Sequence, residues 1–159
     1  MIKLMRVDER LIHGQIAFAW TNAIGANCIF VVNDDAANSP FRIASLKLAS
    51  PPGVKLVIKN VKDAKKALSG TAIDKYNIFL LVDNIKDALD LAQSSDKIKH
   101  INLGNIKMAE NKKQVTNSVF LSDEEFEYIK SLIKLGVEVE CRAIPEDSKV
   151  DPLGGKENA

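Results

Sequence analysis

The sequence has few cysteines and histidines, which limits the chemistry it can support. Each occurs twice among 159 residues, and no C-x-x-C or other close spacing of cysteine and histidine is present. Zinc sites are built from such closely spaced ligands, so we predict no metal centre. The cysteines, Cys28 and Cys141, lie within apolar runs, and we expect both to be buried as small hydrophobic residues.

Long apolar runs and a charge of one sign are also missing. The 22 lysine and arginine residues nearly balance the 21 aspartate and glutamate residues, which argues against nucleic acid as a partner. No apolar segment approaches the roughly 20 residues that span a bilayer, and the N-terminus shows no signal peptide. No G-x-G-x-x-G segment follows the first predicted strand, so no dinucleotide cofactor is expected. The sequence predicts a cytoplasmic protein that reaches a membrane only through partners.

Short β-branched runs alternate along the chain with helical stretches. This alternation is typical of parallel βα units, and the length suits one domain with a sizeable core. We therefore predict an α/β fold, an open and mainly parallel sheet with helices on both faces, in a single domain over residues 1–151. A polar tail, 152–159, follows, and we expect its last residues to be poorly ordered.

The predicted strands are 2–8, 28–33, 55–59, 77–82, 100–103, 118–121 and a last strand at a sheet edge, 137–144. The predicted helices are 14–24, 39–48, 61–69, 85–92 and 122–134. Polar loops follow four of the strands, at 6–13, 33–38, 83–84 and 104–107. Because the carboxyl ends of parallel strands meet at one edge of a sheet, and open sheets bind ligands there, we expect the functional site at that edge. In the first helix we expect one buried face, with spacing i, i+3, i+4, i+7, made by Ile16, Ala19, Trp20 and Ala23.

The first loop, RVDERLIHGQ at residues 6–15, has the strongest functional signal. A strand, a polar loop and a helix N-terminus form an arrangement that binds phosphate in open α/β sheets. A neutral imidazole is a competent nucleophile near neutral pH, so we predict that His13 accepts a phosphoryl group. The planar guanidinium of Arg10 can bind the phosphoryl oxygens, and the free amides at Gly14 and Gln15 add further donors. We also expect Arg6 to bind phosphate.

Other interpretations of these residues stay open at this point. His13 could simply cap the helix beside a surface ion pair, and Asp8 could orient the loop or pair with one of the two arginines. Strand-end aspartates can hold Mg²⁺, but no Asp-x-Asp follows the first strand, and we favour a supporting role for Asp8 and Asp34. His100 is expected to be structural or surface-exposed. The aspartates considered for Mg²⁺ are Asp8, Asp34, Asp35 and Asp83.

The first loop closely resembles the phosphorylation loop of the IIB subunits of the mannose/fructose/sorbose family of bacterial sugar phosphotransferase systems. The similarity continues through 25–27, 31–34, 51–55, 79–82, 101–104 and 135–139, and covers nearly the whole chain to Asp151. One departure is visible. The family often has Gly-Gly after the fifth strand, where this chain has Gly104-Asn105, and we expect Asn105 to tolerate a left-handed turn there.

The resemblance implies that His13 is the phospho-accepting residue, through Nδ1, and that Arg10 assists transfer to the sugar. The donor would be a phosphohistidine of a IIA protein or domain. The acceptor would be a hexose or amino sugar of the mannose, fructose, sorbose or N-acetylgalactosamine class, presented by membrane IIC and IID subunits. No cofactor is implied, and a homodimer suits the family. Two alternatives remain: a non-catalytic anion-binding or regulatory module of the same fold, and a receiver-like domain phosphorylated on aspartate.

Overall fold

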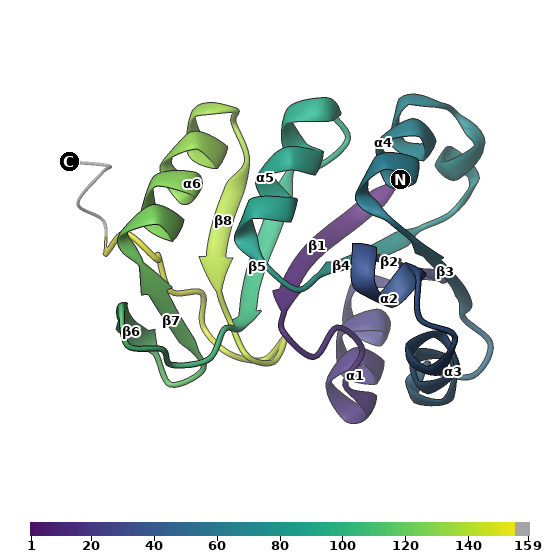
Figure 1. The fold of residues 1–159 in the computed structure, drawn as a ribbon, viewed down its shortest axis with the longest axis horizontal. Helices are drawn as coiled ribbons and strands as arrows, with labels where there is room; N and C mark the ends of the chain where they lie inside the picture. Colours follow the sequence, from purple (N-terminus) through teal and green to yellow (C-terminus); the bar gives the residue numbers. More distant parts are fainter. Residues whose placement is uncertain (155–159) are drawn as a thin grey trace.

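The centre of the molecule is a six-stranded sheet in which every pair of neighbouring strands is parallel. In this computed structural model, which describes residues 1–154, the strand order is β3-β2-β4-β1-β5-β8 (Figure 1). The predicted open parallel α/β sheet is therefore confirmed. Its strands are β1 (Ile2–Asp8), β2 (Cys28–Val32), β3 (Lys55–Lys59), β4 (Ile78–Val82), β5 (His100–Asn105) and β8 (Glu138–Cys141).

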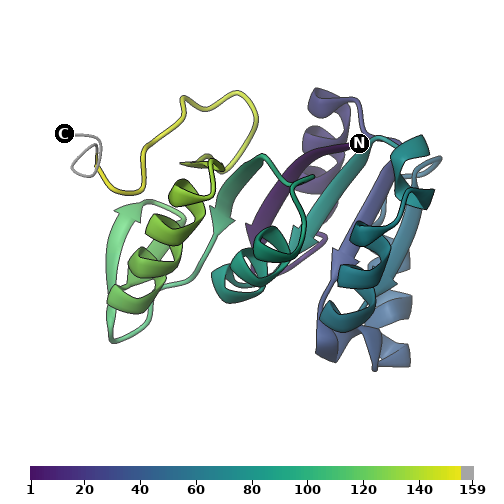
Figure 2. The same cartoon turned by 90° about the horizontal axis from the view of Figure 1, so that it is seen from above.

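Helices cover both faces of this sheet, as predicted. One hydrophobic core cluster joins the sheet to α4, α5 and α6, and a second joins the opposite face to α1 and α3. Figure 2 shows α1 and α5 on opposite sides of the sheet, with the segment after β8 on the α1 side. The helices are α1 (Gly14–Ile24), α2 (Asp34–Ala37), α3 (Pro40–Ala49), α4 (Val61–Ser69), α5 (Ile85–Ser94), α6 (Asp123–Lys134) and the short 3-10 turn η1 (Ala72–Lys75).

The central strands are apolar throughout because both of their faces are covered. Every residue of β2 and of β4 is buried, which explains the continuous apolar runs in the sequence. β8 lies at a sheet edge as predicted, although it is shorter than the predicted 137–144. Cys28 and Cys141 are buried free thiols, also as predicted.

The predicted buried face of α1 is confirmed at Trp20, is only half-buried at Ile16 and Ala19, and is wrong at Ala23. The buried residues of this helix are Ala17, Trp20 and Thr21, and Ala23 is exposed. Alanines occur on several sides of α1, so the apolar spacing alone does not fix its rotation. Thr21 can be buried because its hydroxyl donates to the carbonyl of Ala17 at 2.6 Å.

Three elements were not predicted: the helix α2, the 3-10 turn η1 and the strand β6. Residues 34–37 form the short helix α2, with the side chain of Asn33 accepting from the amide of Ala36. A small antiparallel sheet pairs β6 (Lys112–Thr116) with β7 (Val119–Ser122), and only the second of these strands was expected. β6 is mostly polar and half-buried, so its sequence lacks the apolar pattern that identifies a strand.

The C-terminal part also differs from the prediction. Val150 pairs with Cys141, and Pro152 and Leu153 are buried, so residues 152–154 pack against the domain rather than forming a polar tail. The rest of the predicted tail, 155–159, and the expectation about its order lie outside the described residues.

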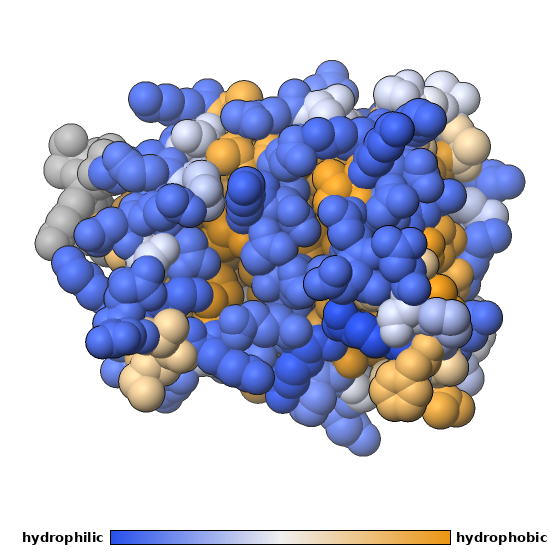
Figure 3. All heavy atoms as spheres, viewed as in Figure 1, coloured by the Kyte–Doolittle hydropathy of each residue, from blue (hydrophilic) through white to orange (hydrophobic). Residues whose placement is uncertain are grey.

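Polar side chains cover most of the molecular face in Figure 3, and hydrophobic side chains project at the corner formed by α3. There Phe41 and Leu48 are 80% and 89% exposed. Across residues 1–154, no helix combines the length and the apolar character needed to cross a membrane.

Candidate functional site

The first loop begins with a tight turn at the end of β1. The carbonyl of Asp8 accepts from the amide of Leu11 at 2.8 Å, and its carboxylate Oδ1 accepts from the amide of Arg10 at 2.9 Å. Leu11 has a left-handed backbone with φ of 59°, unlike every other non-glycine residue in the described part of the chain. That backbone costs about 1–2 kcal/mol for an L-residue. Burial of the Leu11 side chain, which is 2% exposed, offsets the cost and fixes the shape of the loop.

The carboxylate of Asp8 lies buried between two arginines and is 1% exposed. Its Oδ2 accepts from Nε and Nη2 of Arg6 at 3.3 and 3.2 Å, and its Oδ1 lies 3.6 Å from Nε of Arg10. The interpretation that Asp8 orients the loop and pairs with arginine is therefore confirmed. Asp8 holds the turn from the buried side, while the side chain of Arg10 remains 42% exposed at the surface.

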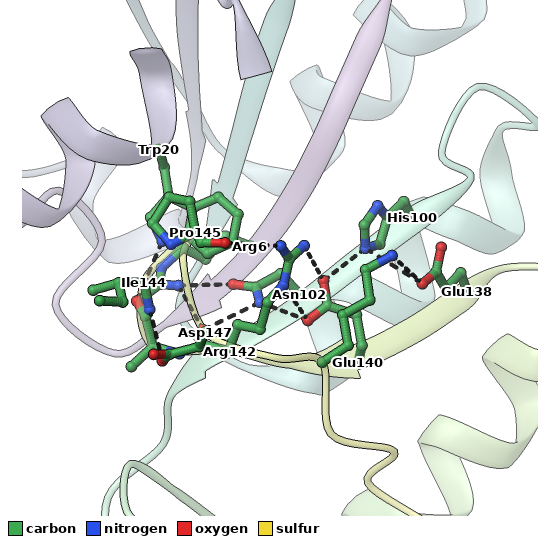
Figure 4. A network of polar contacts seen from close by, with 12 residues as sticks. Arg6, Trp20, His100, Asn102, Glu138, Glu140, Arg142, Ile144, Pro145 and Asp147 are labelled. Atoms are coloured by element: carbon green, nitrogen blue, oxygen red, sulfur yellow. Dashed lines mark hydrogen bonds and ion pairs between the residues drawn. The ribbon is translucent and has the colours of Figure 1, made fainter. Parts of the chain in front are cut away.

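Arg6 has a different position from the one expected. Its side chain is 2% exposed and donates through Nη1 to Oδ1 of Asn102 at 2.7 Å and to the carbonyl of Arg142 at 3.1 Å. Its guanidinium also lies 5.3 Å from the centre of the Trp20 ring (Figure 4). Burial lowers the pKa of Arg6, and the charge of Asp8 opposes this shift. Arg6 therefore supports the loop from the interior, and we do not retain it as a phosphate ligand.

His13 occupies the position before the first turn of α1, and its side chain is exposed. It makes no side-chain capping bond, so the interpretation of His13 as a simple helix cap is wrong. The other five α-helices of the described chain all have a side-chain cap, from Asn33, Ser39, Asn60, Asn84 and Ser122.

The first turn of α1 is open to an anion. It holds no acidic residue, and none of the hydrogen bonds found in residues 1–154 uses the amides of Gly14 or Gln15. A Cβ atom added to Gly14 would meet nothing within 4 Å, so the space beside this backbone is free. Unpaired amides and the helix dipole together favour a negatively charged group next to His13.

The connection after β5 packs against the first loop. The amide of Glu9 donates to the carbonyl of Asn105 at 3.0 Å, and the Glu9 carboxylate accepts from the amide of Lys107 at 2.9 Å. Asn105 lies in the extended strand β5, so the left-handed turn that this residue was expected to tolerate does not occur there. Its side-chain amide instead donates to Asp8 at 3.4 Å.

The other strand-end aspartates bond elsewhere. Asp34 accepts from the amide of Val61 at 2.8 Å and so joins the β2–α2 connection to α4. Asp83 accepts from the side chain of Asn84 at 2.7 Å. Within residues 1–154, no three Cys, His, Asp or Glu side chains are grouped as metal ligands. A supporting role of Asp34 toward His13 stays a prediction, since its bond is to α4.

A buried polar network continues from Arg6 across β5 to β8 (Figure 4). Asn102 donates through Nδ2 to Oε1 of Glu140 at 3.1 Å. Oε2 of Glu140 lies 2.7 Å from Nε2 of His100 and 2.7 Å from Nη2 of Arg142. Burial by itself would raise the pKa of Glu140, but the bonds from His100, Arg142 and Asn102 outweigh it and lower that pKa to about 2.

The sequence interpretation missed most of this network. His100, 24% exposed, is structural, as expected, but Asn102, Glu140 and Arg142 were not singled out. Polar residues at alternate positions of two strands, 100 and 102 with 138 and 140, were the available signal, because alternate residues share one sheet face.

The chain is similar in sequence and in fold to known proteins. The family model described as "PTS system sorbose subfamily IIB component" matches residues 2–154. The sorbose-specific EIIB component of Klebsiella pneumoniae is 32% identical over 152 residues, covering 96% of this chain and 93% of that protein. The mannose-specific EIIAB component of Escherichia coli is 32% identical over 150 residues, covering 94% of this chain and 46% of that protein. The crystal structure of the IIBSor domain of the Klebsiella pneumoniae sorbose permease matches with a TM-score of 0.91 and 31% identity, covering 99% and 96% of the two chains.

We predict that Gly104→Ala destabilises the protein strongly, because the added Cβ would lie 2.0 Å from Cζ of Arg6. Arg6 cannot move away without breaking its bonds to Asp8 and Asn102. Breaking a buried ion pair costs about 3–5 kcal/mol, so the free energy of unfolding measured in urea should fall by about 3 kcal/mol. Gly70→Ala is the matched control, since its Cβ would meet only an ordinary contact at 3.8 Å. Equal stability of the two variants would contradict the close packing of Gly104 on Arg6.

We predict an acid-dependent stability from Glu140. Its pKa falls from 4.5 to about 2 on folding, so its contribution is complete above pH 4.5 and is lost as the pH falls toward 2. At 1.36 kcal/mol per pKa unit, this amounts to about 3 kcal/mol. Urea unfolding of the wild type and of Glu140→Gln should therefore differ at pH 7 and converge near pH 2. A difference that stays constant with pH would refute the assignment.

Proposed function

Because the chain belongs to the sorbose subfamily of IIB components of the phosphotransferase system, we propose that His13 is its phosphoryl carrier. In this proposal His13 takes the phosphoryl group from a phosphohistidine of a IIA protein or domain and passes it to a hexose or amino sugar during uptake through membrane IIC and IID subunits. The main support is the exposed His13 at the uncapped start of α1. The mannose-specific relative named EIIAB supports a IIA donor, because IIA and IIB stand together in its name.

The loading step needs a nucleophile and compensation for negative charge. A neutral imidazole nitrogen of His13, Nδ1 in our proposal, attacks phosphorus as the phosphorus–nitrogen bond of the donor breaks. The phosphoryl oxygens then lie beside the free amides of Gly14 and Gln15 and within the field of the helix dipole. Such catalysis consists mainly of positioning and charge stabilisation, which a preformed loop provides.

The delivery step needs a cation that can follow the moving phosphoryl group. A sugar hydroxyl oxygen replaces the imidazole nitrogen on phosphorus, and the free imidazole is regenerated. Arg10 is suited to assist, because its backbone is fixed by Asp8 while its side chain is 42% exposed. A guanidinium can bind two phosphoryl oxygens at once.

The site has no enclosing sugar pocket in this proposal, and the sugar is held by the membrane partners. The protein would then act in the cytoplasm, at the inner face of the membrane. A non-catalytic module of the same fold could bind an anion at the same amides without a covalent bond. Covalent labelling from radioactive phosphoenolpyruvate through the phosphotransferase proteins separates these functions.

We predict that incubation with phosphoenolpyruvate, the general phosphotransferase proteins and a IIA partner places one phosphoryl group on the chain. The label should be lost in acid and survive alkali, as expected for a phosphorus–nitrogen bond. His13→Ala should abolish the label, and His100→Gln, which changes the only other histidine, should retain it. Labelling that persists in His13→Ala would refute the proposal, and an alkali-labile, acid-stable label would favour an aspartyl phosphate.

We predict that Arg10→Gln slows delivery to the sugar more than it slows loading of His13. The amides at the start of α1 remain in the variant and still stabilise phosphohistidine, whereas the charge that follows the phosphoryl group is lost. Loading and delivery should be timed separately by rapid quench, with membranes containing IIC and IID as the acceptor. A charge-assisted contact supplies about 1.5–3 kcal/mol, so a loss of about tenfold or more in delivery is expected. Equal losses in both steps would contradict this role of Arg10.

A further inference from the structure

A continuous set of buried polar contacts links the edge strand β8 to the first loop. Glu140 accepts from Asn102, Asn102 accepts from Arg6, and Arg6 donates to Asp8. The side chains of Asn102, Arg6 and Asp8 are at most 2% exposed, and Glu140 is 3% exposed. Figure 4 shows the part of this line that runs from Glu140 through Asn102 to Arg6.

Arg6 contacts the supports of both ends of the first loop. At the start of the loop, Arg6 donates to Asp8, whose carboxylate also holds the amide of Arg10. At the end of the loop, α1 is fixed by Trp20, whose ring centre lies 5.3 Å from Cζ of Arg6 and 4.9 Å from Cζ of Arg142. The position of one guanidinium therefore affects both the turn before His13 and the helix after it.

The position of Arg6 is fixed in turn by β5 and β8. Oδ1 of Asn102 accepts a hydrogen bond from Nη1 of Arg6, and Oε1 of Glu140 accepts one from Nδ2 of Asn102. Glu140 also binds Arg142 through two bonds, at 3.0 and 2.7 Å, and the carbonyl of Arg142 accepts from Arg6. Fully paired buried networks of this kind make an arrangement rigid.

We propose that Asn102 and Glu140 are positioning residues for phosphoryl transfer, and this rests on the proposed function of His13. They touch neither the phosphoryl group nor the sugar. They hold Arg6, and through Arg6 they set the relative placement of Arg10 and His13. A small displacement of a reacting group can lower a rate by up to 10²-fold. A substitution at Glu140 that shifts Arg6 should therefore lower the rate of phosphoryl transfer to His13.

The test compares Glu140→Gln with Glu138→Gln. Both substitutions remove one negative charge from β8. Glu138 is half-exposed, and its contacts, with Lys149 at 2.7 Å and His100 at 4.0 Å, involve neither Asn102 nor Arg6. Phosphoramidate serves as the donor, because its phosphorus–nitrogen bond breaks and ammonia leaves as the bond to His13 forms, with no partner protein needed. We expect the single-turnover rate to fall about tenfold in Glu140→Gln and to stay within about twofold of wild type in Glu138→Gln.

A double substitution separates positioning from general weakening of the fold. This comparison times delivery to the sugar, the step in which Arg10 is proposed to act. If Glu140 acts through the placement of Arg10, Arg10→Gln combined with Glu140→Gln should deliver about as slowly as Arg10→Gln alone, because contacting networks are non-additive. Losses that multiply would overturn the proposal, as would equal rates for Glu140→Gln and Glu138→Gln.

Trp20 is the only tryptophan, so its fluorescence during urea titration shows that each variant is folded at the assay temperature. If Glu140→Gln is unfolded, the variant Asn102→Ser replaces it in the test, because this substitution removes the side-chain oxygen that accepts from Arg6. The same fall in the single-turnover rate is expected. Failure of phosphoramidate to label wild-type His13 would count against the proposed function itself. Normal labelling with no loss in Glu140→Gln or Asn102→Ser would overturn the positioning role only.

Discussion

The ion pair between Arg6 and Asp8 is the interaction on which the geometry of the first loop depends. Both side chains are buried under the first loop, and a buried charge is stable only when it is paired and fully hydrogen-bonded. Arg6 meets this requirement through Asp8, Asn102 and a backbone carbonyl, and Gly104 leaves the space its guanidinium occupies. Loss of either partner would leave the other charge uncompensated inside the sheet. The same pair fixes the turn through Asp8 and α1 through Trp20, so stability and site geometry rest on one contact.

The residues proposed to do chemistry lie on the outer side of the loop that this ion pair supports, and they are accessible to solvent. Arg10 and His13 are exposed, and α1 begins without the side-chain cap that the other five α-helices of the described chain possess. A cap contributes about 1 kcal/mol, so its absence at one helix is a local cost. Such departures from local rules are expected where function needs an unpaired donor or an accessible nucleophile. The strained backbone of Leu11 belongs to the same region, and its buried side chain holds the loop in place.

The parallel sheet, its edge strand β8 and the polar loop that leads into α1 could be predicted from the sequence, because each has a local signal. These signals are continuous apolar runs, βα alternation and a dense polar motif before a helix. The errors came from contacts between residues distant in the chain. Arg6 stands beside the loop in the sequence, but the pleat of β1 directs its side chain to the sheet face under Trp20. There it bonds to Asn102 of β5, which in turn bonds to Glu140 of β8. Likewise the rotation of α1 depends on the packing of Trp20 against two arginines, Arg6 and Arg142, which apolar spacing cannot reveal.

A phosphoryl carrier of the proposed kind must present the same histidine to two unlike partners in turn. A deep pocket around His13 would exclude at least one of them, so the nucleophile has to stand at the surface, where a loop is normally mobile. Catalysis by positioning nevertheless demands a loop held to within a fraction of an ångström. An exposed loop can meet both requirements only if contacts on its inner side, toward the sheet, hold it in place. The buried line from Glu140 through Asn102 and Arg6 to Asp8 supplies it from the interior of the sheet, and thereby leaves the outer side of the loop free for the partners.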